Sequence, residues 1–98
     1  MIHRFVKLTF HEEYVELFTS RFDKIKLNIR NMEGCEYLRL FQDKKDPRIF
    51  FTHSIWIDEA HLNAYRKSEF FGVYWPEVKK LFAKSPMAWS LDQLEELS

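Results

Sequence analysis

Along this chain of 98 residues, segments with an apolar residue at every second position are followed by segments with one at every third or fourth position. This change of period limits the possible folds more than any other feature. Residues 2–10, IHRFVKLTF, repeat with a period of two, which predicts a strand with one well-buried face. In residues 11–29 the apolar positions lie three or four apart, which predicts one amphipathic helix of about five turns. The chain therefore begins with a strand that leads directly into a helix.

Polar residues and a glycine mark the expected helix ends. Thr9 and Glu12 have the spacing of a capping box before the first helix, and Gly34 is the expected stop after it. Asp58 and Ser68 each precede a segment with helical spacing and are expected to cap it. The second half of the chain should therefore contain two helical pieces.

Three more segments have the period of a strand. Residues 35–43 and 48–57 alternate and are separated by a short polar stretch with a proline, so they predict a β-hairpin. Residues 86–94 predict the last strand. Between them, Pro76 lies too deep for a first-turn proline in a helix that starts at Ser68, so we expect a kink or a fresh helix start near Trp75.

The order strand, helix, strand, strand, helix, strand predicts an α+β protein. It is the ferredoxin-like βαββαβ pattern, a four-stranded antiparallel sheet with helices on one face, and residues 1–98 are expected to form a single domain. Residues 48–57, however, place Phe51 and Ile55 on one side and Phe50 and Trp56 on the other. Because the second face has no helices to cover it, we expect an isologous homodimer in which two sheets pack together.

The amino-acid composition limits the kinds of molecule that the protein is expected to bind. Fifteen basic and fifteen acidic side chains give a formal net charge of zero, so we expect no nucleic-acid partner. No signal peptide and no apolar run of about 18–20 residues is visible, and we expect a soluble, cytoplasmic protein without a membrane partner. The single cysteine, Cys35, is expected to be a buried, inert thiol, and the scattered histidines predict no metal site.

The amino-acid sequences of two segments resemble those of a known protein family. They are SIWIDEAHLNAYRKSEFF and WPEVKKLFAKSPMAWSLD, and they resemble the antibiotic biosynthesis monooxygenase (ABM) family, as does nearly the whole chain. The resemblance implies a dimeric α/β barrel and, more loosely, oxygen chemistry without flavin, metal or other cofactor. The substrates it implies are phenols, quinols or related electron-rich rings.

The family also includes haem-degrading enzymes, and the resemblance allows that branch to be tested by residue. The position of their iron-ligating histidine falls on Trp75, which cannot ligate iron. Their first-strand asparagine falls at about Val6, and their ring-distorting tryptophan falls on Tyr65. We therefore do not expect haem degradation.

Two residues are candidates for catalysis. Cofactor-free oxygenation needs a substrate anion in a dry pocket, so a base or a fixed cation is required. His53 is the candidate base, and Arg39 could hold an oxyanion. The alternatives are a structural sheet histidine and an arginine paired with a carboxylate across the dimer. The hairpin could bring the two together, but alternation does not determine the register.

The pocket is expected between the sheet and the helices. Its candidate walls are Trp56, Tyr65, Trp75 and Trp89, whereas Phe71 is expected in the core. The leading hypothesis is a cofactor-independent monooxygenase that oxidises a small aromatic or quinol-type substrate with O2. The alternatives are a non-catalytic homodimeric barrel that binds a small hydrophobic ligand, and an isomerase on the same fold.

Overall fold

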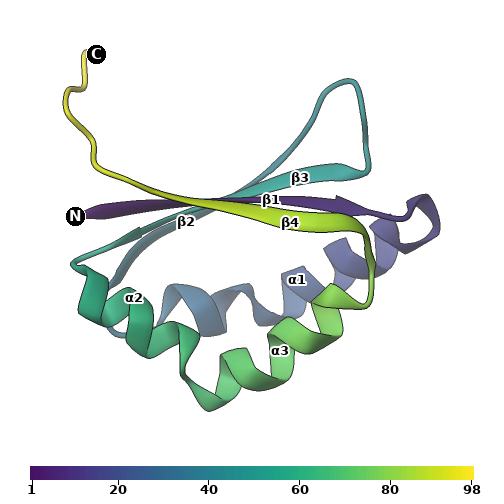
Figure 1. Ribbon diagram of the computed structural model, residues 1–98, viewed down its shortest axis with the longest axis horizontal. Coiled ribbons are helices and arrows are strands. Elements are labelled where there is room, and N and C mark those ends of the chain that lie inside the picture. The colour runs from purple at the N-terminus through teal and green to yellow at the C-terminus, as the bar shows by residue number, and fades with distance from the viewer.

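The computed structural model describes residues 1–98 and contains one four-stranded antiparallel sheet with three α-helices on one of its faces (Figure 1). The ferredoxin-like α+β prediction is confirmed. The elements are β1 (Ile2–Phe10), the 3₁₀ helix η1 (Glu12–Tyr14), α1 (Val15–Arg30), β2 (Cys35–Gln42), β3 (Ile49–Trp56), α2 (Glu59–Arg66), α3 (Glu69–Lys79) and β4 (Phe82–Leu91). None of the helices is long and apolar enough to cross a bilayer.

The strand order is β2-β3-β1-β4, which places the first strand of the chain at the centre of the sheet. The predicted β2–β3 hairpin is present, and the Asp43 carboxylate accepts hydrogen bonds from the backbone N–H groups of Lys45 and Asp46 in its turn. Such an Asx-type contact replaces backbone bonds that the turn cannot make. The hairpin register is thereby held at its closed end.

The two predicted caps of the second half are confirmed. Asp58 Oδ1 accepts from the backbone N–H of His61 at 2.9 Å, and Ser68 Oγ accepts from that of Phe71 at 3.1 Å. The capping box expected at Thr9 is wrong, because Thr9 remains buried within β1 and its side chain caps nothing. The chain leaves β1 through η1 instead.

Two expected boundaries differ from the structure. The fresh helix start near Trp75 is wrong, because α3 is continuous through Pro76. Proline leaves the carbonyl four residues earlier without its helical donor, and that residue, Gly72, is exposed to water. β4 begins at Phe82 instead of residue 86, because a register shift in its pairing with β1 disturbs the period of two.

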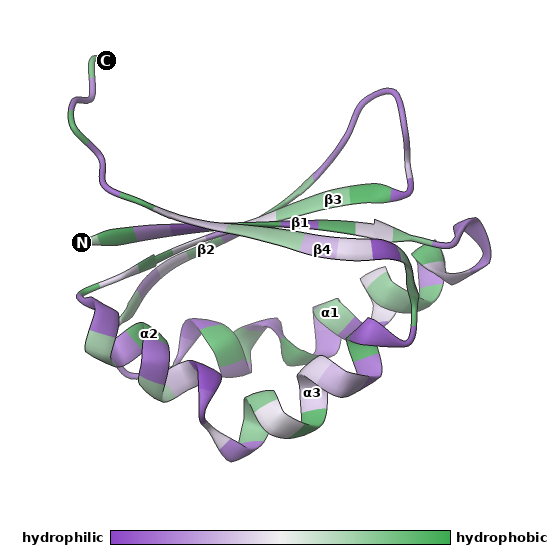
Figure 2. Cartoon of the chain, viewed as in Figure 1, coloured by the Kyte–Doolittle hydropathy of each residue, from purple (hydrophilic) through white to green (hydrophobic).

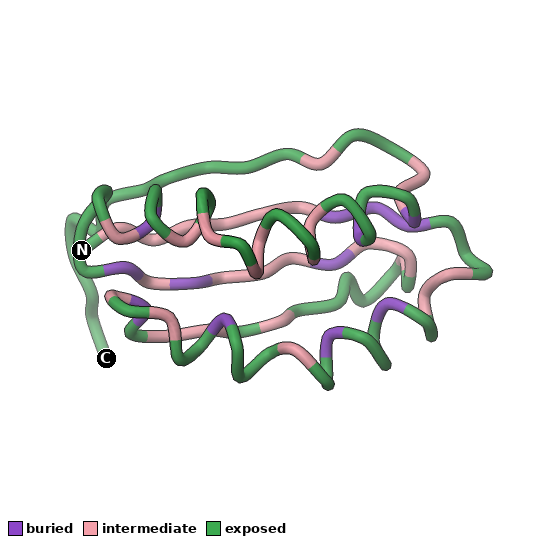
Figure 3. Tube along the Cα trace, turned by 90° about the horizontal axis from the view of Figure 1, so that it is seen from below, coloured by how far each residue is buried: buried purple, intermediate pink, exposed green.

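The hydrophobic core lies between the helices and the inner face of the sheet. Buried positions recur along α1, whereas α2 and α3 each contribute one, and others lie on the strands behind them (Figure 3). Phe10 of β1 is fully buried and stacks on Phe18 of α1 with ring centroids 4.2 Å apart. Aromatic contacts of this kind add to the burial of large apolar areas, so they position α1 on the sheet.

The opposite face of the sheet has no helix over it, and we call it the open face (Figure 1). Strand pairing places Trp89 opposite Phe5 and Met87 opposite Lys7 on this face. Apolar residues recur along the strands although the helices cover one side only (Figure 2). Exposed large apolar side chains of the open face are Phe41, Met87, Trp89 and Leu91.

Candidate functional site

A cavity of about 200 Å³ lies between the sheet and the helices, and we call it the inner cavity. Tyr65 of α2 and Trp75 of α3 line it, as the sequence predicts for two of the candidate walls. Val6 of β1 and Ala88 of β4 face them from the sheet. All three α-helices and all four strands contribute to this lining, so the whole fold shapes one cavity.

The aromatic wall of the inner cavity is held by a chain of ring contacts. Trp56 stacks on Tyr65 at 5.0 Å, Tyr65 meets Phe71 edge-on at 5.1 Å, and Phe71 stacks on Trp75 at 5.6 Å. Trp56 is fully buried, and its Nε1–H donates to Ser54 Oγ at 3.0 Å. Trp56 therefore supports Tyr65 from behind without lining the cavity. Phe71, expected in the core, takes part in the wall.

Only two charged side chains line the inner cavity, and both are arginines. Arg4 is half-buried on β1, and Arg66 is the last residue of α2. No carboxylate lines the cavity with them. Arg4 Nη1 donates to the neutral Ser90 Oγ at 2.9 Å. Burial first, and then the charge of Arg66, lower the pKa of Arg4. The inner cavity thus combines apolar walls with two positive charges.

These arginines are the charged residues of the candidate site that sequence reasoning missed. Arg4 shares the inner face of the first strand with Ile2, Val6 and Leu8. An arginine within an apolar stripe is a detectable signal, because a charge on a buried face needs a partner. Arg66 carries no comparable signal, since it ends an ordinary amphipathic helix.

Two phenol groups, in addition to the hydroxyl of Thr52, add neutral polar groups to the lining. Burial raises the pKa of both Tyr65 and Tyr74 far above the ordinary value, and Tyr74 adds to the effect on Tyr65. Both therefore stay neutral at neutral pH. Neither hydroxyl makes a hydrogen bond to another group of the chain, and both keep some accessible surface. A bound molecule can use both phenols as hydrogen-bond donors or acceptors.

The two predicted catalytic residues lie together but on the open face. Arg39 is directly opposite His53 in the β2–β3 ladder. The His53 ring stacks on Phe5 at 4.2 Å, and the Arg39 guanidinium lies 4.4 Å above the Tyr37 ring. Burial, followed by the charges of His3 and Arg39, lowers the pKa of His53. The sheet separates this cluster from the inner cavity.

The six predicted site residues therefore do not form one site. Tyr65 and Trp75 line the inner cavity, and Trp56 lies behind it. Trp89 lies on the open face with His53 and Arg39, and it is 39% exposed. A pocket between sheet and helices that uses His53 and Arg39 is excluded by this geometry, because alternating side chains on a strand point to opposite faces.

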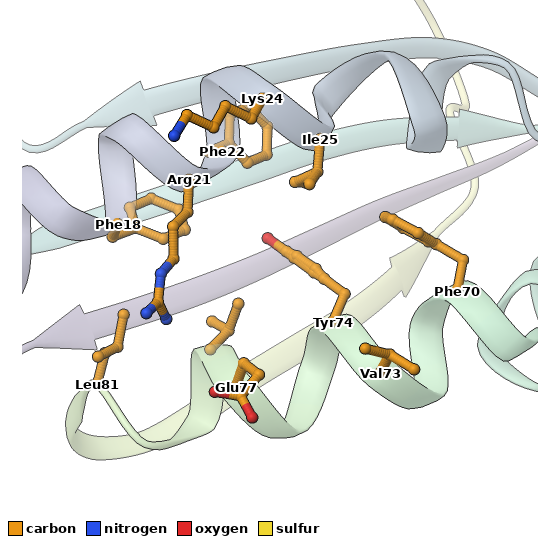
Figure 4. A pocket seen from close by; sticks show the side chains of 11 residues that line it. Phe18, Arg21, Phe22, Lys24, Ile25, Phe70, Val73, Tyr74, Glu77 and Leu81 are labelled. Atoms are coloured by element: carbon orange, nitrogen blue, oxygen red, sulfur yellow. The ribbon is translucent and has the colours of Figure 1, made fainter.

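A second hollow, of about 390 Å³, lies between α1 and α3 (Figure 4). Phe22 and Tyr74 line both this groove and the inner cavity. Figure 4 shows the Tyr74 ring reaching from α3 toward α1, with Arg21 and Glu77 at the edge of the groove. Tyr74 therefore stands between the two hollows.

The potential metal ligands are scattered over the structure, and the one cysteine is buried. No three potential ligands among histidine, cysteine, aspartate and glutamate cluster together. Cys35 is buried beside Trp56 and Leu62, and burial raises its pKa, so it is a protonated thiol at neutral pH. It belongs to a small core cluster at one end of the sheet.

The chain has a ferredoxin-like α+β fold with a cavity between its sheet and its helices. The family model "Antibiotic biosynthesis monooxygenase" matches residues 1–79, and the chain belongs to this family. No curated protein sequence matches the chain significantly.

Solved structures of the same fold span nearly the whole chain. A crystal structure described as antibiotic biosynthesis monooxygenase is 20% identical, covers 97% of this chain and 100% of its own, and has a TM-score of 0.90. A conserved protein from Methanosarcina mazei Go1 is 21% identical over 92% of this chain and 89% of its own, with a TM-score of 0.86. A putative antibiotic biosynthesis monooxygenase from Deinococcus radiodurans is 14% identical over 100% and 97%, with a TM-score of 0.88. At these identities the likeness shows the fold alone.

Proposed function

We propose that the protein is a cofactor-independent monooxygenase that oxidises a small quinol-type ring with O2 in the inner cavity. One observation carries the proposal. The cavity has aromatic walls and two arginines, Arg4 and Arg66, with no carboxylate to neutralise them. Membership of the ABM family supports the same class of reaction.

The proposed reaction needs no external reductant when the substrate is a quinol. A hydroquinone ring gains one oxygen atom and loses two hydrogens, which leave with the second oxygen atom of O2 as water. The quinol supplies all the electrons, so the balance needs no reductant. The electron-rich species is the quinolate, and fixed positive charge in a water-poor site favours that anion.

The cavity lining contains no histidine, aspartate or glutamate that could act as a base. His53, the predicted base, lies on the open face. We therefore assign Arg4 and Arg66 the role of stabilising the quinolate, and the phenolic proton leaves to solvent. The reaction rate should accordingly rise with pH as the bound quinol ionises.

The volume limits the substrate. A cavity of roughly 150 Å³ can hold benzene, whereas sites for drug-sized ligands span roughly 300–1,000 Å³. The inner cavity, at about 200 Å³, matches one substituted ring. Three fused rings would require the Tyr74 side chain to move.

We also propose that a second copy of the chain covers the open face and forms the sheet-to-sheet dimer. Phe41 and Trp89 expose 45% and 39% of their surface there, an arrangement that favours association. The Tyr37 hydroxyl is buried on this face without a hydrogen-bond partner in the chain. A facing copy can supply one, as buried polar groups require.

Oxygen consumption tests the function. Methylhydroquinone should be consumed with uptake of O2, and anthrone, with three rings, should be a poorer substrate. Arg4→Gln and Arg66→Gln should each lower kcat/KM about tenfold or more, because a charge-assisted contact to the anion is lost. Arg21→Gln, an exposed α1 residue outside the inner cavity, is the matched control.

The proposal fails if no quinol supports O2 uptake by the folded protein. Ring binding without uptake would leave the non-catalytic ligand-binding barrel as the function. Uptake that is unchanged in both Arg4→Gln and Arg66→Gln would remove the arginines from the mechanism.

A further inference from the structure

Arg4 and Arg66 come from different elements, a strand and a helix end, and converge on one cavity. Neither forms a salt bridge with a carboxylate of the chain, and the polar contact of Arg4 is with a neutral serine hydroxyl. Each guanidinium raises the electrostatic cost of the other, as the effect of Arg66 on the pKa of Arg4 reflects. An anion between them would offset this repulsion.

We propose that the substrate of the inner cavity is a ring with its own carboxylate, bound by Arg4 and Arg66, and thus a quinol acid of the dihydroxybenzoate class. The inference rests on the proposed function and names its substrate class. Guanidinium groups recognise carboxylates through paired, parallel hydrogen bonds, which gives orientation as well as affinity.

Charge matching favours a quinol acid over a neutral quinol. The acid carries one negative charge at neutral pH and two once a phenolic proton has left. Two guanidiniums match that reactive dianion, whereas the monoanion of a quinol without a carboxylate would leave one of the two positive charges without a counter-charge.

The remaining lining fits the rest of the ring. Tyr65 and Trp75 offer apolar faces on one side, and the sheet offers Val6 and Ala88 on the other. The neutral phenols of Tyr65 and Tyr74 can hydrogen-bond a second ring hydroxyl. A free inorganic anion would satisfy the arginines but would leave these aromatic walls unused.

Binding without oxygen separates this inference from the catalytic proposal. Under anaerobic conditions, titration calorimetry would compare 2,5-dihydroxybenzoate with 2,5-dihydroxybenzamide, which has nearly the same shape but no charge. The wild-type protein should bind the acid at least about tenfold more tightly than the amide. This preference should weaken as salt is added, because exposed and half-exposed charges are screened.

The variants locate the charge that causes the preference. Arg66→Gln and Arg4→Gln should each reduce the ratio of the two affinities toward one, while the affinity for the amide changes little. Arg21→Gln should keep the wild-type ratio. Arg66 is exposed at a helix end, so its variant tests the inference even where Arg4→Gln reduces stability.

Three outcomes overturn the inference: equal affinity for acid and amide, an acid preference that survives in both arginine variants, or no binding of either ligand at millimolar concentration. If the protein binds the acid more tightly than the amide but takes up no O2, only the monooxygenase proposal is contradicted. If it takes up O2 with neutral quinols but binds acid and amide equally, only the quinol-acid inference is contradicted.

Discussion

The Nδ1 atom of His3 lies 2.9 Å from the Nε2 atom of His53 on the open face of the sheet. One of these nitrogens must accept the hydrogen bond, so at least one ring has to be neutral. Burial, His3 and Arg39 together lower the pKa of His53 from its ordinary value of 6.5. The folded chain therefore holds fewer protons at His53 than the unfolded chain does.

This histidine pair predicts a loss of stability in mild acid. The contribution of His53 is complete above the unfolded pKa of about 6.5 and is lost as the pH falls from there through the lower folded pKa. The melting temperature, followed by circular dichroism between pH 7.5 and 5, should fall, and His53→Gln should flatten that fall. A wild-type profile with the slope of the variant would contradict the prediction.

His61 should act in the opposite direction. Its pKa is raised, first by the hydrogen bond to Asp58, with Nδ1 and Oδ1 2.7 Å apart, and then by the nearby charges of Asp58 and Glu33. Its contribution is complete below pH 6.5 and is lost as the pH rises through the folded pKa. His61→Asn should therefore remove a small decline on the alkaline side of the same melting profile. An unchanged alkaline side would contradict this assignment.

The open face predicts the oligomeric state. Light scattering at micromolar concentration should give a mass twice the 12.0 kDa of one chain. Trp89→Glu places a charge on the open face and should shift the mass toward the monomer, because a buried unpaired charge is costly. Val73→Glu on α3, at a position 67% exposed, is the control and should remain dimeric. A mass of one chain for the wild-type protein would contradict the proposed dimer.

The two glycines should respond in opposite ways to alanine. Gly34 has a φ of 86°, and an added Cβ would lie 2.4 Å from the side chain of His61, so Gly34→Ala should lower the free energy of unfolding by about 1–3 kcal/mol. Gly72 lies in α3 with open space around it, so Gly72→Ala should raise it by about 0.5–1 kcal/mol. Urea titrations measure both. A Gly34→Ala variant as stable as the wild type would contradict the assigned backbone strain.

The order of elements could be predicted from the sequence because each has a clear apolar period and the caps at Asp58 and Ser68 are local. The misplaced start of β4 depends on its pairing with β1, where a register shift falls between the partners of Lys7 and Thr9. Such a shift follows from contacts between distant segments, so a local period of two does not reveal it.

The candidate site was only half predictable for a related reason. The predicted hairpin of residues 35–43 and 48–57 could bring His53 and Arg39 together, and the structure shows that they are directly opposite each other in the β2–β3 ladder. Alternation does not show which face the helices cover when both faces are apolar, as on β3. The inner cavity also brings Arg4 and Arg66 into one lining, and no spacing along the chain encodes that arrangement.

The last prediction concerns haem and follows from the presence of Trp75 in the inner cavity. Val6, Tyr65 and Trp75, the three positions that the family resemblance relates to haem degradation, all line the inner cavity. The indole of Trp75 has an N–H donor and no lone pair for iron, and no histidine lines the cavity. The cavity of about 200 Å³ is also smaller than sites for drug-sized ligands, and haem is larger than such ligands.

Titration with haemin should therefore give no Soret shift of the kind that histidine ligation produces. The same titration of His53→Gln is the control, because the histidines of the open face could bind haemin at the surface without use of the cavity. A shift that saturates at one equivalent and persists in His53→Gln and in His3→Gln would contradict the argument from Trp75. It would show that iron finds a ligand in the inner cavity despite the indole.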